Sequence, residues 1–255
     1  MITIKTPEEI KKLREGGRRL ATILHELAGM VKPGVSAFEL DKHAQMLAEK
    51  GGDKPAFLGY KPYGARKPYP ASICVSVNEE VVHGIPTEDK IFQEGDIVAI
   101  DMGLVHEGLI TDSAITVIVG QGDEQAQKIV DATRVALQRG IAAVKAGNTV
   151  GDIGHAIEQY VKPFGYGHAE GLAGHGVGYK VHEDPYVPNT GKPGTGEDLV
   201  AGMVIAIEPM LNEGTGKVIF DKDGYTVRTK DGKRSVHFEH TVAVTEKGCV
   251  VLTER

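Results

Sequence analysis

EGDIVAID at residues 94–101 and AGMVIAIE at residues 201–208 are two similar stretches of this chain. Each is a near-continuous apolar run that ends on a carboxylate, Asp101 in the first and Glu208 in the second. An apolar run of this length is consistent with a buried strand. If the two strands are matching parts of an internal repeat, their acids occupy equivalent positions, and we expect a site at the seam between two halves.

A second pair of stretches supports the repeat. VKPGVSAFEL at 31–40 resembles VKAGNTVGDI at 144–153, and this pair is separated by nearly the same length of chain as the first. We therefore predict a single domain, residues 1–255, built from pseudo-symmetric halves of about 1–120 and 121–255.

Hydrophobic periodicity predicts two helices followed by strands, and then the same order again. The predicted helices cover residues 7–30, 36–49, 123–146 and 149–162. The predicted strands cover residues 73–77, 96–105 and 113–120, with a turn at Glu107-Gly108, and a strand-rich region from 174 has turns at 191–196, 223–224 and 231–232. Thr6 with Glu9, and Ser36 with Glu39, have capping-box spacing at helix starts. This order of elements predicts an α+β fold.

The composition is that of an ordinary globular protein, with 41% apolar and 25% charged residues. A net charge of −6 argues against DNA or other nucleic acid as the main partner. There is no apolar run of about 18 residues to span a membrane, and the N-terminus does not resemble a signal peptide. Only Cys74 and Cys249 are present, which predicts no disulfide framework. We expect a cytoplasmic protein.

Four acids lie in apolar, strand-like surroundings: Asp101, Asp112, Glu208 and Glu239. Any one of them alone is more often a turn or capping residue. Burying a carboxylate costs free energy unless the group is paired or bound to a metal. The four acids together are therefore harder to explain as turn or capping residues than any one of them alone.

The glycine-rich stretch GLAGHGVGYKVHEDP at 171–185 contains two histidines, His175 and His182. We expect its glycines to let the backbone bend closely around a ligand. The stretch matches neither a dinucleotide-binding loop nor a P-loop. His83 is a third candidate, although a lone histidine is more often a surface or satisfied core residue.

Two other kinds of site find no support in the sequence. The segment 221–233 lacks the acid spacing of an EF-hand, and there is no GxSxG elbow for a serine nucleophile. Four carboxylates and one imidazole instead suit two divalent ions, with an activated water as the nucleophile.

Seven motifs together resemble the type I methionine aminopeptidases. They are SICVSVNEEVVHGIP, GDIVAIDMG, TDSA, GHGVGYKVHEDP, IAIEPM, DGYTVRTKDG and FEHTVAVT, and the resemblance extends over residues 3–253. It implies the pita-bread fold, in which two pseudo-symmetric α/β halves share a central curved antiparallel sheet backed by helices.

The resemblance also implies a role for individual residues. The implied metal ligands are Asp101, Asp112, His175, Glu208 and Glu239. Asp112 and Glu239 would bridge two ions, Asp101 would complete one, and His175 with Glu208 the other. Glu208 would also act as the proton-transfer base. The implied contacts to the substrate amide are His83 and His182, and those to the methionine side chain are Tyr60, Tyr69, Cys74 and Tyr225.

The activity implied is removal of the initiator methionine from nascent polypeptides whose second residue is small. The cofactor would be two divalent ions, which the ligand types allow to be cobalt, manganese, iron or zinc. A monomer and transient contact with the ribosome are expected, and we assign the ribosomal contact to Lys61, Arg66 and Lys67.

The chain departs from the family pattern around the methionine pocket. The segment KPYGARKP at 61–68 is longer than usual. Phe57 replaces a frequent cysteine, Tyr225 a usual tryptophan, and Val181 a usual aromatic residue. These differences concern the shape of the pocket and leave the implied ligands unchanged.

Two alternative functions fit the sequence less well. An X-Pro peptidase of the same fold usually carries an extra N-terminal domain, and often an arginine near its last ligand, where this chain has histidine at 237 and 240. A catalytically inactive binding module typically loses ligands, whereas this sequence keeps all five.

Overall fold

The first two helices begin at the capping residues that the sequence predicts. The computed structural model describes residues 2–62 and 64–255. Helix α1 (Pro7–Met30) begins after Thr6, whose side chain accepts from Glu9 N, and α2 (Ala37–Lys50) begins after Ser36 in the same way. These reciprocal bonds satisfy N–H groups that have no partner inside a helix, so they determine where the helices start.

A second pair of helices follows in the other part of the chain, α3 (Glu124–Ala142) and α4 (Val150–Val161), with a short 3-10 turn η1 (Lys162–Phe164) after it. Helix α3 ends four residues before its predicted end at 146. Residues 143–149 instead form turns in which Gly147 has a left-handed φ of 88° and donates to Leu199 O.

Nine strands of the described chain form one antiparallel sheet in the order β1-β4-β5-β14-β9-β7-β8, with β2 paired to β4 and β15 to β14. Their bounds are β1 Lys54–Pro55, β2 Cys74–Val77, β4 Ile97–His106, β5 Leu109–Ile118, β7 Gly174–Gly176, β8 Glu183–Val187, β9 Val204–Ile207, β14 Glu239–Thr245 and β15 Gly248–Val251.

The predicted start of the third strand was wrong. We expected it at 113, but β5 begins at Leu109, directly after the predicted turn at Glu107-Gly108. Leu109 already pairs with His106 across that two-residue turn, so Asp112 lies inside the strand.

Two small sheets lie beside the large one. One contains β3 (Glu80–Val82), β12 (Val227–Thr229) and β11 (Val218–Phe220), and the other contains β6 (Gly167–His168), β10 (Met210–Asn212) and β13 (Ser235–His237).

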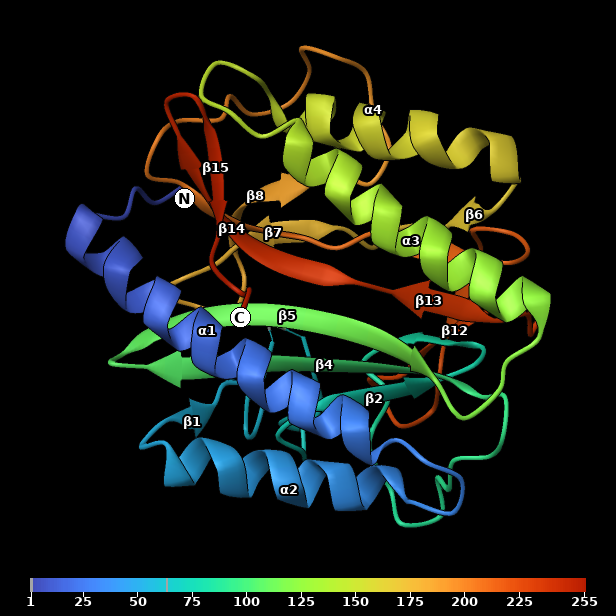
Figure 1. The fold of residues 1–255 in the computed structure, drawn as a ribbon. Helices are drawn as coiled ribbons and strands as arrows, with labels where there is room; N and C mark the ends of the chain where they lie inside the picture. The colour runs from blue at the N-terminus through green and yellow to red at the C-terminus, as the bar shows by residue number, and fades with distance from the viewer. Residues whose placement is uncertain (1, 63) are drawn as a thin grey trace.

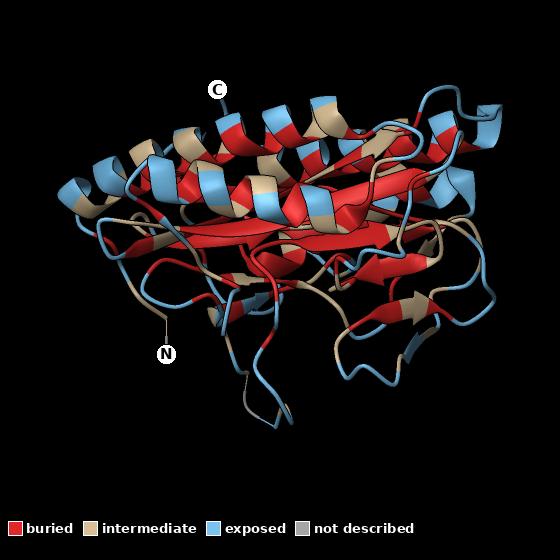
Figure 2. Cartoon of the chain, turned by 90° about the horizontal axis from the view of Figure 1, so that it is seen from below, coloured by how far each residue is buried: buried red, intermediate tan, exposed pale blue. Residues whose placement is uncertain are grey.

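The four long helices cover one face of the large sheet (Figure 1). Helices α1 and α2 lie over β4 and β5, and α3 and α4 lie over the part of the same face that contains β14, β9 and β8. Seen edge-on, buried strands separate this helical layer from a layer of loops and small strands (Figure 2). Residues 98, 100, 102 and 104 of β4 pack with α1 and α2 in one apolar cluster, and Ile205, Ile207 and Val242 pack with α3 and α4 in another. The mixed α+β, pita-bread arrangement predicted from the sequence is confirmed.

The repeated stretches contribute β4 and β9, which lie on either side of the adjacent pair β5 and β14. An internal repeat would produce this order, although the division into equivalent halves stays a prediction. Among the described residues, we find no helix that is both long and apolar enough to cross a membrane.

Candidate metal centre

Strand alternation places the four predicted acids on the face of the sheet that the helices leave open. In β4 the even-numbered residues pack against α1 and α2, so Asp101 points to the opposite face. In β9 and β14 the residues at 205, 207, 242 and 244 pack toward the other helices, which leaves Glu208 and Glu239 on the open face. Asp112 shares its face with Ala114, two residues along β5.

The strand register then brings these acids into one row. Asp101 and Glu239 both lie opposite Ala114, from the two neighbours of β5. Ile207 pairs with His240, so Glu208, the next residue, lies beside Glu239. Four carboxylates, three from β4, β5 and β14 and one from the residue directly after β9, therefore converge near the middle of the sheet.

Hydroxyl groups join β5 to β14 where the backbone ladder is short, with only two registered residue pairs in the described structure. Thr241 Oγ1 accepts from Asp112 N at 2.9 Å and donates to Asp112 O at 2.6 Å. Ser113 Oγ donates to Glu239 O at 2.7 Å. These bonds fix the backbone of two of the four acids directly.

His175 reaches the same place from β7, and its flanking glycines do not act as we expected. A Cβ on Gly174 would lie 2.2 Å from Ala206 O, and one on Gly176 would lie 2.1 Å from Asp184 O. The glycines therefore permit close approach to the neighbouring strands β9 and β8, and they do not form a bend around a ligand. This close packing holds His175 beside the acids.

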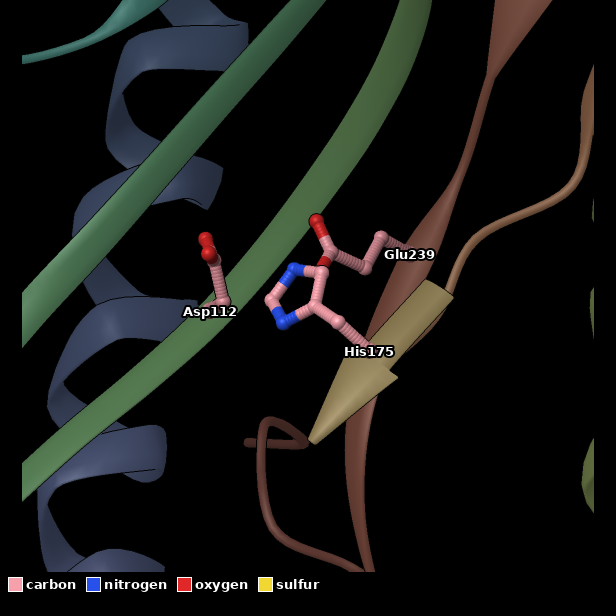
Figure 3. Close-up of side chains that lie close together, drawn as sticks. All are labelled: Asp112, His175 and Glu239. Carbon is pink, nitrogen blue, oxygen red and sulfur yellow. The ribbon is translucent and has the colours of Figure 1, made fainter. Parts of the chain in front are cut away.

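Three of the predicted ligands form a compact group. Donor atoms of Asp112, His175 and Glu239 all lie within 4.8 Å of one another. Their side chains project toward one another from β5, β7 and the start of β14 (Figure 3). Asp101 and Glu208 line the same cavity.

Several atoms of this group are buried with no hydrogen-bond partner among residues 2–62 and 64–255. They are Asp101 Oδ1, Asp112 Oδ1, Glu239 Oε1 and His237 Nε2. Buried polar atoms without partners are rare in folded proteins and call for an explanation such as an ion. Carboxylate oxygens with an imidazole are suitable ligands for divalent metals, so the residues fit a metal centre.

Burial and mutual repulsion raise the pKa values of the four acids. Burial raises the pKa of Glu208 to about 8, and burial with the nearby charge of Glu208 raises that of Asp112 to about 8. The pKa values of Asp101 and Glu239 are raised well above their usual range, first by burial and then by the charge of Asp112. A divalent cation would reverse this effect by favouring the charged carboxylates.

His237 is a site residue that we did not predict. Its Nε2 lies 3.5 Å from Glu208 Oε2, and His175 Nε2 lies 3.5 Å from Glu208 Oε1. Burial lowers the pKa of both imidazoles to about 3, so near neutral pH these are contacts of neutral rings and not ion pairs. The spacing of His237 two residues before Glu239 was the available signal.

His83 and His182 line the same cavity as the acids. Burial, followed by the charge of His182, lowers the pKa of His83 to about 4, and burial lowers that of His182. His182 Nδ1 lies 2.9 Å from Tyr60 OH, and its ring centroid lies 4.4 Å from that of His175. The φ of 59° at His83 is unusual for a residue with a side chain and often marks a functional site.

One cavity of about 100 Å³ joins the acids to an apolar pocket. Its lining consists of Phe57, Tyr60, Pro62, Tyr69, Cys74, Val82, His83, Asp101, Asp112, His175, Val181, His182, Glu208, Tyr225, His237 and Glu239. The lining includes the four residues predicted to contact the methionine side chain and the three pocket positions where the chain departs from the family pattern. Residue 63, within the long segment 61–68, lies outside the described residues.

The rings of this pocket are held by specific contacts. Tyr69 OH donates to Ile73 O and Gly84 O, each at 3.1 Å. The ring of Tyr225 packs edge-on against Tyr69 at 5.1 Å between centroids, and its hydroxyl donates to Lys67 O. These contacts tie the long segment to the pocket wall.

Comparison with known proteins gives a consistent family. The model of metallopeptidase family M24 matches residues 11–246. A methionine aminopeptidase from Aquifex aeolicus is 49% identical over 99% of this chain and 99% of its own length. A crystal structure of methionine aminopeptidase from Thermotoga maritima has a TM-score of 0.95 and 45% identity, with full coverage of both chains. A prolidase from Pyrococcus furiosus has a TM-score of 0.80 and 25% identity, and this chain covers 65% of it.

Proposed function

The chain belongs to metallopeptidase family M24 and, within it, to the methionine aminopeptidases, and we propose on this basis that it removes the initiator methionine from nascent polypeptides. The observation that carries the proposal is the single cavity in which a carboxylate–imidazole group opens directly onto an apolar pocket. The full-length similarity to methionine aminopeptidases, against partial coverage of a prolidase, favours this activity over X-Pro cleavage.

The proposed ligands of two divalent ions are Asp101, Asp112, His175, Glu208 and Glu239. Support comes from the compact group of Asp112, His175 and Glu239 and from the unpartnered buried oxygens around it. In our proposal Asp112 and Glu239, which lie in the middle of the row of acids, would help to hold both ions. Divalent ions held there would supply Lewis acidity and a water of lowered pKa as nucleophile.

The chain's own groups would move the protons and stabilise developing charge. Glu208, which a divalent cation would keep in its charged form, would accept a proton and pass it to the leaving amine. His83 and His182 would donate N–H groups to the substrate amide and to the oxyanion that develops there. When Tyr60 OH donates to His182 Nδ1, the proton of the neutral ring stays on Nε2 and is available to the substrate.

The apolar part of the cavity would bind the methionine side chain. Tyr60, Tyr69, Cys74 and Tyr225 are the proposed contacts, together with Phe57 and Val181. A flexible thioether packs well against aromatic rings, which supports this assignment. The small second residue required of the substrate would lie beyond the scissile bond, next to the histidines.

Methionine release from Met-Ala-Ser and Met-Leu-Ser peptides tests the proposal. We expect metal-stripped protein to be inactive, activity to return when one of cobalt, manganese, iron or zinc is added, and the alanine peptide to be preferred more than about 10-fold. Activity without metal, or equal cleavage of both peptides, would contradict the proposal. Cleavage of Xaa-Pro peptides instead would identify an X-Pro peptidase.

A cytoplasmic monomer that contacts the ribosome transiently completes the proposal. A single chain supplies every proposed site residue, and initiator methionine becomes accessible as chains leave the ribosome. Lys61, Arg66 and Lys67 lie on the segment that contains Pro62, which lines the cavity, and this location supports our assignment of the ribosomal RNA contact to them.

We expect reversal of these three charges, to glutamate, to weaken ribosome binding while hydrolysis of free peptide persists. Co-sedimentation with ribosomes at increasing salt measures the effect, since phosphate contacts are lost as salt rises. Unchanged ribosome binding by the triple variant would rule out this segment as the contact.

A further inference from the structure

A buried ion pair joins the N-terminal segment to the loop that carries His182. Lys5 Nζ lies 2.7 Å from Glu183 Oε2, and the two side chains are only 1% and 4% exposed. Thr3 Oγ1 donates to the same carboxylate oxygen at 2.5 Å. Burying two charges gains little net stability, because the loss of hydration offsets their attraction. Such a pair is better explained if it fixes a local conformation.

The other oxygen of Glu183 holds the loop in its folded form. Glu183 Oε1 accepts from Tyr179 N at 2.6 Å and from Lys180 N at 2.9 Å. This loop, residues 177–182, connects β7 to β8, and His182 is its last residue. The carboxylate of Glu183 therefore binds the middle of the loop, and the backbone of Glu183 directly follows His182.

The N-terminal segment supports the same loop from outside. Lys5 N donates to Gly202 O at 2.8 Å, which anchors the segment to the chain just before β9. A Cβ on Gly178 would lie 2.4 Å from Lys5 Cε, so the stem of Lys5 fits only because residue 178 has no side chain. Lys5 Nζ lies 5.0 Å from the centroid of the Tyr179 ring, and Tyr179 OH donates to Glu9 Oε1 at 2.8 Å.

The His182 ring lines the cavity, whereas the Lys5–Glu183 pair lies behind the loop that carries it. It contacts Tyr60 OH and the His175 ring, whereas the carboxylate of the next residue, Glu183, bonds to Lys5 and the loop. Glu183 also pairs with Gly176, the residue after His175. A shift of Glu183 would therefore move His182 and disturb its position relative to His175.

We infer that Glu183 and Lys5 are positioning residues that set the place of the His182 ring in the cavity, an inference that rests on the role proposed for His182. The pair acts through the loop and does not touch the substrate. The N-terminal segment thereby helps to position a proposed catalytic group, although it lies outside the cavity.

The variant Lys5→Met/Glu183→Ala tests this without leaving a lone buried charge. We expect kcat to fall about 10–100-fold, as for other residues that orient a ligand or catalytic group, while KM changes less. Lys5→Met/Glu183→Gln keeps an oxygen that can accept from the two loop N–H groups but loses the contact with Lys5, so its kcat should lie between those of Lys5→Met/Glu183→Ala and the wild-type protein. The exposed pair Lys128–Glu124, also 2.7 Å apart, provides the control Lys128→Met/Glu124→Ala, which should keep wild-type kcat.

A double-mutant cycle separates positioning from general damage. If the pair acts through His182, Lys5→Met/Glu183→Ala should lower kcat no further in a His182→Ala background. An equal fold loss in both backgrounds, or wild-type kcat in the original background, would overturn the inference.

A readout that does not depend on activity keeps this test distinct from that of the proposed function. The imidazole ¹⁵N signals of His182 in metal-free protein should shift in Lys5→Met/Glu183→Ala and stay unchanged in the control. Should that variant unfold, Glu183→Asp, which keeps the charge but shortens its reach, should shift the same signals. Unshifted His182 signals in a folded variant would overturn the inference, whereas failure of the wild-type protein to release methionine would contradict only the proposed function.

Discussion

The Glu208→Gln variant is expected to release methionine about 10²–10⁴ times more slowly than the wild-type protein. Glutamine has nearly the shape of glutamate and keeps one oxygen toward the cavity, but it cannot accept the proton that the reaction must move. Because the pocket residues are unchanged, we expect the loss to appear mainly in kcat and not in KM. Steady-state kinetics with Met-Ala-Ser, at saturating metal, measures both constants.

The same substitution also removes a charge from a proposed ligand, so metal content must be measured alongside the kinetics. Metal bound per chain, determined on the purified variant, separates loss of the base from loss of the cofactor. Glu197→Gln, at an exposed position, is the matched control and should keep full activity. Full activity in Glu208→Gln would remove the proposed role of this residue.

Local patterns predicted the ends of some elements well because local contacts determine them. The capping boxes at Thr6 and Ser36 are complete within four residues, and both helices begin there. The start of β5 was missed because strand pairing resumes at once after the turn at Glu107-Gly108, before the apolar run that begins at 113. The end of α3 depends on contacts with residues near 199, which lie far along the chain.

The acids of the site were predictable as a set, but their convergence was not. Alternation along β4 and β5, which the structure shows, places Asp101 and Asp112 on the face opposite the apolar cluster. The register between β5 and β14 is set by pairing between segments distant in sequence, and only the structure shows Asp101 and Glu239 opposite the same Ala114. His237 was missed for a related reason, since a lone histidine has no chemical partner until the fold brings Glu208 to it.

Metal should stabilise the protein more at pH 8 than at pH 6, and Asp112→Asn should reduce this effect. Burial and Glu208 raise the pKa of Asp112 from 3.8 to about 8, so in metal-free protein the folded state binds this proton more tightly than the unfolded state. The free energy of unfolding of the metal-free protein therefore falls as the pH rises from about 4 to about 8. Asparagine carries no charge at either pH, so the variant should lack the part of this loss that Asp112 causes.

Two opposite changes in Tm are thus expected from one substitution at pH 8. Without metal, Asp112→Asn should have a free energy of unfolding on the order of 1–3 kcal/mol higher than that of the wild-type protein. Its Tm should rise by about 2–4 °C for each kcal/mol. With divalent metal at about 100 times its Kd, the wild-type protein should gain about 2.7 kcal/mol, and the variant much less. At pH 6 the metal must displace protons from the acids, so the wild-type gain is smaller.

Calorimetry on metal-stripped and metal-loaded samples at both pH values measures these changes, with Asp198→Asn at an exposed position as the matched control. A metal-free variant that melts below the wild-type protein at pH 8 would show that the Asp112 carboxylate stabilises the fold by itself. A variant that keeps the full metal-induced rise would show that Asp112 is not a ligand. Lower stability without metal and higher stability with it are both consequences of gathering four carboxylates in one buried row. The metal should bind tightly because its positive charge offsets the repulsion among these buried carboxylates.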